Sequence, residues 1–364
     1  MPRIKKILFR LTIVLIALIG VVTLATYLIT SLPQFGKKPM GDHLEKIKKS
    51  PQHNGEIFEN AGGIEVKMNL SKFSKMFVSY LNPPDNKTPV PPPAIMHPGA
   101  QNIGNEPDSV TLLTWFGHSA LLLEMDGKKI LIDPMLGPAA SPFPFMIKRF
   151  TDDLAIPMDS IPEVDFVIFS HDHYDHLDYP TILALKDRVK HFYVPLGLGS
   201  HLEYWGVESN KISEHDWWDE INADGIRLVC TPSQHFSGRS TDDGASTLWA
   251  SWVIQGKKKK IFFSGDSGCF PGFKAIGEKY GPFDIALMEC GQYNIMWHEI
   301  HMLPEETAQA GSDVNTKHLM PIHWGMFDLS LHAWTEPILR VKEAAKSLDL
   351  EIVTPRLGQR FSLD

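Results

Sequence analysis

Short apolar runs separated by polar turns fill the chain from about residue 108 onward. Runs of this length, rich in branched and aromatic residues, are typical of buried strands. They cover residues 110–115, 120–124, 129–132, 164–169, 226–230, 248–254, 260–263, 285–288 and 318–322. Apolar residues at helical spacing predict helices over 304–314 and 337–348. Many strands with interspersed helices indicate a layered α/β domain.

A different pattern occupies the amino-terminal end, where residues 11–29 contain no charged side chain. A run of this length is close to the ~20 residues that a helix needs to cross the hydrocarbon layer, and it predicts a retained membrane anchor. A cleaved signal peptide is the alternative, but no small-x-small cleavage site follows. Basic residues lie on both sides of the run, so the positive-inside rule does not decide its orientation. We expect a single-pass protein with its amino terminus inside and its domain on the outer, periplasmic or extracytoplasmic, face.

The segment between the anchor and the strand-rich region is polar and proline-rich. Proline cannot donate the amide hydrogen bonds of a regular helix or a central strand, and the run 89–93 contains four prolines. We therefore expect three parts: a membrane anchor at 1–30, a linker or wrapping arm at 31–107 and a layered α/β domain at 108–364.

Composition excludes some classes of partner. The formal net charge is -8 and the basic residues are scattered, so nothing resembles the basic stripe that follows a nucleic-acid backbone. Three widely spaced cysteines offer neither a disulfide framework nor paired zinc thiolates. Sixteen histidines remain, and their clustering is informative.

One cluster follows the predicted strand at 164–169 directly and has the sequence HDHYDH. Residues two apart on an extended chain project to the same side, so His171 and His173 would bind one metal ion together. Asp175 and His176, in the turn that follows, would face a second ion. Imidazole nitrogen and carboxylate oxygen are ligands that zinc accepts. This run therefore predicts two neighbouring metal sites.

Three single residues come after other predicted strands: His235 in TPSQH, Asp266 in FFSGDSG and His323 in MPIHWG. The ends of strands are where an α/β sheet presents its chemistry. Each residue alone is more often structural than a ligand, but together the three complete two sites.

In their order, HDHYDH, a lone His, GD and a second lone His resemble the metallo-β-lactamase superfamily. Further segments from Leu112 to Phe361 are similar in order and spacing to the N-acyl-phosphatidylethanolamine-hydrolysing phospholipase D family. They are TWFGHSALLLEMDG, Asp133-Pro134, HDHYDHLDYP, VPLGL, DWW, TPSQH, GDSG, GPFD and IHWGMF. The resemblance implies an αββα sandwich, preceded here by the expected transmembrane helix.

The resemblance also implies roles for single residues. His171, His173 and His235 would hold one zinc ion, Asp175, His176 and His323 the other, and Asp266 would bridge the two. His301 falls where the family has a histidine near the substrate phosphate, and Tyr174 matches a tyrosine in the family's metal run and would contact substrate. The stretch 143–147 departs from the family, because proline and phenylalanine replace a glutamine implicated in substrate contact.

We therefore expect a zinc-dependent phospholipase D that carries two Zn²⁺ and releases N-acylethanolamine and phosphatidic acid. Asp175 or Asp266 would hold the proton of the nucleophile, and His301 would orient phosphate or protonate the leaving group. A lactonase or another phosphoesterase acting on a soluble substrate is the alternative, and a non-catalytic membrane-tethered binding protein is a third reading. Expected partners are a membrane phospholipid and the membrane itself, and a homodimer stays open.

Several other residues have two readings each. His118, in the GHSA turn, approaches the metal site or makes a structural hydrogen bond. Asp178 supports a ligand histidine or caps a helix. The apolar residues of 143–150 form an acyl-chain groove or a buried flap, with the groove favoured. Trp217 and Trp218 are expected to pack a loop rather than to bind ligand.

Overall fold

The computed structural model describes residues 2–64 and 70–364, and the strands within these residues form two seven-stranded sheets. The first sheet has the order β14 (Arg360–Ser362), β1 (Leu112–Gly117), β2 (Ala120–Met125), β3 (Lys128–Ile132), β4 (Val164–Ile168), β5 (Val189–Pro195) and β6 (Ile212–His215). The second has the order β13 (Glu351–Ile352), β12 (His318–Ile322), β11 (Ile285–Glu289), β10 (Lys260–Phe263), β9 (Ser251–Gln255), β8 (Ile226–Thr231) and β7 (Glu220–Ala223).

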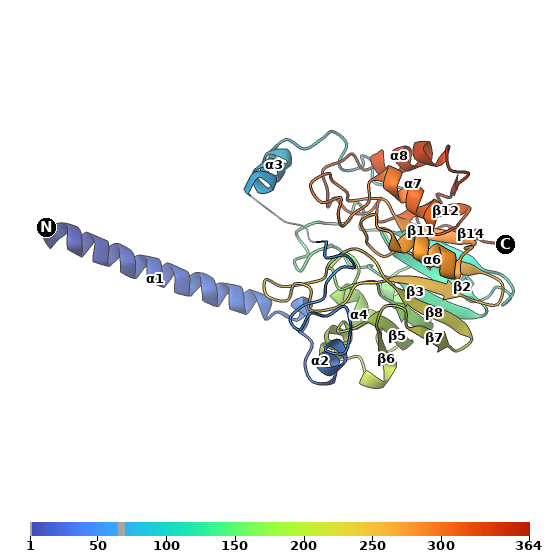
Figure 1. The fold of residues 1–364 in the computed structure, drawn as a ribbon, viewed down its shortest axis with the longest axis horizontal. Coiled ribbons are helices and arrows are strands. Elements are labelled where there is room, and N and C mark those ends of the chain that lie inside the picture. The colour runs from blue at the N-terminus through green and yellow to red at the C-terminus, as the bar shows by residue number, and fades with distance from the viewer. Residues whose placement is uncertain (1, 65–69) are drawn as a thin grey trace.

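Helices cover the outer face of each sheet, so the layers follow one another as helix, sheet, sheet, helix (Figure 1). The first sheet is covered by α4 (Tyr179–Leu185) and α5 (Gly199–Tyr204). The second is covered by α6 (Gly272–Tyr280), α7 (Pro304–Asp313) and α8 (Glu336–Ala345). Short 3-10 turns lie at η1 (Pro33–Phe35), η2 (Ala100–Asn102), η3 (Met158–Ser160) and η4 (Ser209–Lys211). The expected αββα sandwich is confirmed.

The central strands are apolar on both faces because each face packs against another layer. In β2, Leu121 and Leu123 belong to the core between the two sheets, whereas Leu122 packs beneath the helices of the first sheet. In β10, Phe263 faces the inter-sheet core and Phe262 faces the helices of the second sheet. Successive side chains point to opposite faces of a strand, so burial of both faces produces the continuous apolar runs seen in the sequence.

The nine predicted strands and two predicted helices are confirmed, with the strand expected at 248–254 beginning three residues later at Ser251. The Asp126-Gly127 turn joins β2 to β3 with both residues at positive φ, and the Gly256 turn joins β9 to β10. The sequence analysis missed β5, β6, β7, β13 and β14, together with α4, α5 and α6. Four of these strands have four residues or fewer, and β6 and β7 are partly exposed edge strands with mixed polar residues. The seven-residue β5 has the polar residues Lys190 and His191 directly after its first residue.

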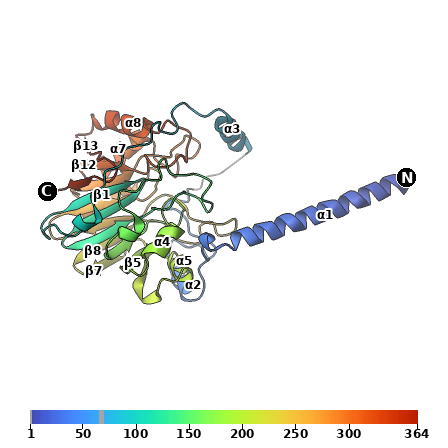
Figure 2. The same ribbon diagram turned by 180° about the vertical axis from the view of Figure 1, so that it is seen from behind.

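The amino-terminal segment lies outside the sandwich. Helix α1 (Pro2–Thr30) projects away from it in both views, and its apolar side chains are exposed along its length (Figures 1 and 2). Among the described residues it is the helix that is long and apolar enough to cross a membrane. The chain then passes over the domain through α2 (Asp42–Ile47) and continues to α3 (Leu70–Leu81), which is drawn apart from the sandwich in both figures. Ile47 and Phe58 are buried against the inter-sheet core, so this part of the chain wraps the domain.

Candidate metal centre

Strand ends bring the candidate ligands to one edge of the sandwich. The run HDHYDH follows β4, and its turn leads into α4, where Asp178 accepts a hydrogen bond from the backbone N–H of Thr181. His235 comes after β8, Asp266 after β10 and His323 directly after β12. The sequence analysis singled out these residues from four separate segments, and the structure brings their side chains together.

The first group contains His171, His173, His235 and Asp266, whose ligand atoms all lie within 4.8 Å of one another. Nδ1 of His173 lies 2.9 Å from Nε2 of His171 and 3.2 Å from Nε2 of His235. Two nitrogens bound to one tetrahedral zinc ion at 2.0–2.1 Å are separated by about 3.3 Å, so these spacings suit a shared cation. Burial lowers the pKa of His171 and His235 well below the usual value, which keeps both imidazoles neutral, as ligation requires.

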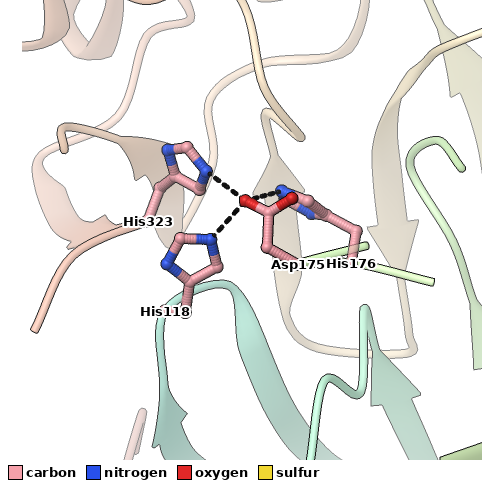
Figure 3. Close-up of side chains that lie close together, drawn as sticks. All are labelled: His118, Asp175, His176 and His323. Carbon is pink, nitrogen blue, oxygen red and sulfur yellow. Dashed lines mark hydrogen bonds and ion pairs between the residues drawn. The ribbon is translucent and has the colours of Figure 1, made fainter. Parts of the chain in front are cut away.

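The second group surrounds the carboxylate of Asp175, as Figure 3 shows. Oδ2 of Asp175 lies 3.2 Å from Nε2 of His323 and 3.6 Å from Nε2 of His176. The same oxygen lies 2.8 Å from Nε2 of His118, which joins this group. Asp175, His176 and His323 are the three residues expected to hold a second ion, and they meet here as the resemblance implied.

Asp266 lies between the two groups. Its Oδ2 is 3.1 Å from Nε2 of both His176 and His323, and 3.7 Å from Nε2 of His171. Burial favours the neutral acid, but the imidazoles of His176 and His323 hold the pKa of Asp266 well below its usual range. A single carboxylate therefore faces both groups as an anion, which is the position that a bridging ligand needs.

Unpaired polar atoms show that these residues fit a metal. Within the described part of the chain, Oδ1 of Asp266 is buried without a hydrogen-bond partner, and Nε2 of His176 makes no hydrogen bond although it faces the Asp266 carboxylate. A buried polar atom without a partner is costly, and buried anions are normally paired or coordinate a metal. Cations shared by the two groups would satisfy both atoms and offset the buried carboxylates.

Residues behind the ligands fix the orientation of the imidazoles. Nδ1 of His176 lies 2.6 Å from Oδ2 of Asp133, and Nδ1 of His171 lies 2.9 Å from Oγ of Ser170. Nδ1 of His235 lies 3.0 Å from a backbone carbonyl oxygen. Such contacts hold the opposite nitrogen toward a metal and raise its basicity. The sequence analysis gave Asp133 no role, although its place after β3, at the same edge, was a usable signal.

His118 approaches the metal site, the first of the two interpretations given above. It does so from the turn between β1 and β2. Its backbone N–H donates to the carbonyl of Trp324, and the N–H of His323 donates to the carbonyl of His118. Burial and the nearby imidazole of His323 lower the pKa of His118 to about 3, so its ring is neutral. The hydrogen bond from His118 orients Asp175 from the side opposite the ligand run.

His301 lies beside the second group on the loop between β11 and α7. Its Nδ1 is 2.8 Å from Oε2 of Glu289, a fully buried carboxylate at the end of β11. Its ring is parallel to that of His323, with centroids 5.2 Å apart. Burial opposes protonation, but Glu289 outweighs it and raises the pKa of His301. Glu289 thus occupies Nδ1 of His301, and Nε2 is the ring nitrogen that Glu289 does not contact. The sequence analysis did not find Glu289.

Two other candidates have structural partners. The hydroxyl of Tyr174 donates to the carbonyl of Arg239 at 2.6 Å, and its ring packs against that guanidinium and the ring of Phe35. Asp178 caps α4, and its side chain also accepts from the N–H of Gly137. Of its two interpretations, helix cap or support for a ligand histidine, the structure shows the cap.

The tryptophans and the 143–150 stretch also have defined positions. Trp217 is buried and donates to the carbonyl of Trp249, and Trp218 stacks on Tyr280, so both pack as expected. Phe145 is 71% exposed, and the 143–150 stretch does not line the cavity described below. The expected acyl groove is therefore not part of this cavity, whose wall includes Ile57 and Phe58.

A cavity of about 810 Å³ opens above the metal groups. Its floor contains side chains of both groups and His301. Its walls are mainly apolar and come from residues 57–64, from α3 and from the loops after β8, β11 and β12: Ile57, Phe58, Ile64, Met76, Phe236, Trp297, Ile300 and Leu329. An apolar cavity with a few convergent polar groups is the usual form of a ligand site.

Comparison with known proteins assigns the class. Residues 128–324 match the beta-lactamase superfamily domain. The chain belongs to this superfamily and has the fold of its metal-dependent hydrolases. A solved isothiocyanate hydrolase from Delia radicum gut bacteria has the same fold, with a TM-score of 0.54 and 22% identity over 69% of this chain and 98% of that one.

Relatives within the superfamily are more specific. The chain is 32% identical over 334 residues to N-acyl-phosphatidylethanolamine-hydrolyzing phospholipase D 1 of Caenorhabditis elegans, which covers 85% of this chain and 93% of that protein. It is 42% identical over 252 residues to an uncharacterized protein of Mycobacterium tuberculosis, covering 68% of each chain. The family resemblance found in the sequence is thus confirmed.

Proposed function

We propose that this protein is a dinuclear zinc phosphodiesterase that hydrolyses N-acyl-phosphatidylethanolamine to N-acylethanolamine and phosphatidic acid. The observation that carries the proposal is a pair of ligand groups on the floor of an apolar cavity, with Asp266 of the first group also facing His176 and His323 of the second. Such a floor suits a phosphate, and such walls suit the hydrocarbon chains attached to it. The similarity to a nematode phospholipase D of this specificity supports the same substrate.

Zinc is the metal that the ligand chemistry favours. Both groups consist of imidazole nitrogens and carboxylate oxygens, with no thiolate among their members. These ligands suit zinc, and iron or manganese would also accept them. His171, His173 and His235 would hold one ion, and Asp175, His176 and His323 the other, with Asp266 shared.

When bound, two zinc ions activate water as a nucleophile and stabilise negative charge on the phosphate. Asp175 or Asp266 accepts the proton that the attacking water gives up as its oxygen adds to phosphorus. His301 donates a proton to the oxygen of the departing N-acylethanolamine as the phosphorus–oxygen bond breaks. Glu289 serves this step because it holds His301 in position and favours its protonated form.

Helix α1 places this chemistry at a lipid surface. We infer that it spans the membrane once and that the catalytic domain lies on the outer face. Its exposed apolar length and the absence of charge from residues 11–29 support insertion. A tethered hydrolase meets its phospholipid at a high effective concentration. Protease added to sealed right-side-out vesicles should digest the domain, and protection of the domain would reverse the orientation.

A substrate comparison tests the proposed reaction. Purified full-length protein is assayed on vesicles containing N-acyl-phosphatidylethanolamine, on lactones and on soluble phosphodiesters, with His173→Ala as the control for contaminating activity. Release of N-acylethanolamine and phosphatidic acid in equal amounts is the expected result. Turnover of lactones or soluble diesters without turnover of the lipid would identify a different hydrolase. No turnover of any class would favour the non-catalytic reading.

A further inference from the structure

The polypeptide that follows the anchor contacts the residues that carry and support the two candidate ligand groups. We call residues 31–64 the arm. It lies outside the 128–324 region matched by the superfamily domain. The blue segment in Figure 1 runs from α1 past α2 and over the domain. At three points it makes hydrogen bonds to residues that carry or support the candidate ligands.

The first contact is made through Arg239, a buried residue of the loop after His235. Its Nη2 donates to the carbonyl of Gln34 at 2.8 Å. Its Nη1 donates to the carbonyls of Asp172 and Leu177, at 2.5 and 2.8 Å. One guanidinium therefore ties the arm to the backbone of the ligand run. Arginine suits this position because its planar group carries five donors in fixed directions.

The second contact passes through His201 of α5. The backbone N–H of Lys37 donates to Nδ1 of His201 at 3.0 Å, and Nε2 of His201 lies 3.3 Å from Oδ2 of Asp172. The approach is close because the preceding residue is Gly36. A Cβ at that position would lie 2.1 Å from Nδ1 of His201, and its φ of +74° also disfavours other residues.

The third contact is the most direct. Asn60 Oδ1 accepts from the backbone N–H of His235 at 3.0 Å, and Asn60 Nδ2 donates to the carbonyl of His235 at 2.8 Å. The indole N–H of Trp249 donates to the same Oδ1 at 2.9 Å. One side chain of the arm thus holds both backbone polar groups of a candidate metal ligand.

We propose that the arm is part of the metal centre, with Asn60 as a positioning residue for His235. Removal of the Asn60 amide leaves the N–H and carbonyl of His235 without these partners, and leaves Trp249 with its remaining bond to a carbonyl. The backbone at His235 then relaxes, and its imidazole leaves the position set by the other two histidines. Arg239 and His201 act in the same direction on the ligand run. This inference rests on the metal centre and not on the identity of the lipid substrate.

The test compares full-length protein with Asn60→Ala and with the matched variant Asn54→Ala. Asn54 also lies in the arm, but its side-chain bonds run to Glu59 and to the N–H groups of Glu56 and Ile57, within the arm itself. Zinc affinity is measured by competition with a chelating dye, and the cobalt-substituted proteins are compared by visible absorption. We expect Asn60→Ala to bind zinc about 10- to 100-fold more weakly, with an altered cobalt spectrum. Asn54→Ala should match the unmodified protein in both.

A second variant keeps the result interpretable if Asn60→Ala does not fold. Asn60→Asp retains an oxygen that accepts from His235 and Trp249, but its other oxygen faces the carbonyl of His235 in place of the donor. Its zinc affinity should therefore also fall below that of the unmodified protein. Unchanged zinc affinity and an unchanged cobalt spectrum in the folded Asn60 variants would overturn the role of the arm. An unmodified protein that binds neither metal would instead overturn the metal centre itself.

Discussion

The ligand edge of the sandwich and the arm serve the same site by different chemistry. At the edge, imidazoles and carboxylates converge from the ends of β4, β8, β10 and β12. A bound cation would satisfy the buried polar atoms of these side chains. The arm contributes no residue to either ligand group, and its contacts there are an amide side chain and backbone atoms. The edge supplies the chemistry, whereas the arm supplies position and the apolar wall of the cavity. A domain common to a superfamily can therefore keep its metal ligands, while a segment outside that domain positions the ligands and lines the cavity above them.

Loss of a ligand at the edge should have the largest effect. His173→Ala removes the nitrogen that lies nearest to both His171 and His235 in the first group. We expect loss of metal from that site and hydrolysis reduced to the uncatalysed level, measured by elemental analysis and by release of phosphatidic acid. Full metal content in this variant would show that the first group is not assembled as described.

Loss of His301 should separate rate from metal binding. His301→Ala leaves the seven proposed ligands intact, so its zinc content should equal that of the unmodified protein. Its turnover should fall by about 10²- to 10⁴-fold, the usual contribution of general acid–base catalysis. Loss of zinc would instead place His301 among the ligands, and unchanged turnover would leave it a structural residue.

Removal of the anchor alone should spare the metal centre. A chain that begins at Ser31 keeps the whole arm, including Gln34, Lys37 and Asn60. We expect it to leave the membrane fraction, whereas the full-length protein resists a high-salt wash because burial of α1 does not depend on surface charge. Hydrolysis of vesicle lipid should fall by about 10²-fold through loss of tethering, with hydrolysis of a micellar substrate retained. Loss of zinc from the shortened chain would contradict this prediction, because it would show that zinc binding depends on α1.

The smallest effect concerns the pH dependence of arm docking. Nδ1 of His43, on α2, lies 2.8 Å from Oε1 of Glu214, and this carboxylate raises the pKa of His43 above its usual 6.5. A raised pKa in the folded state stabilises the fold fully below pH 6.5, and this contribution disappears as the pH rises through the raised value. Urea unfolding across that range should show a loss of about 1 kcal/mol or less, absent in His43→Gln. An identical pH profile in both proteins would contradict it.

The sequence predicted the ligand edge better than the arm, for physical reasons. The run at 171–176 could be found because several ligand types at strand-end spacing rarely coincide in a structural loop. His235, Asp266 and His323 could be found because together they complete the two sites of that run, whereas His118 stayed open and Glu289 was missed because neither is needed to complete a site. Asn60 was beyond reach, because its partner lies 175 residues away and an asparagine in a loop is ordinary.

The same limit applies to the cavity. The phenylalanines at 143 and 145 predicted an acyl groove, but the apolar wall of the cavity includes arm residues such as Ile57 and Phe58. Apolar residues in a loop predict burial or contact, but they do not show which surface of the protein they will contact. The layered sandwich, in contrast, followed from local runs, because the central strands are buried on both faces.

Elemental analysis of the purified full-length protein tests the central claim most directly. The account predicts about two zinc ions per chain, because two ligand groups share Asp266, and it predicts that a chelator removes both zinc and hydrolysis together. A chain without stoichiometric transition metal, or one that remains fully active after the metal has been removed, would contradict it.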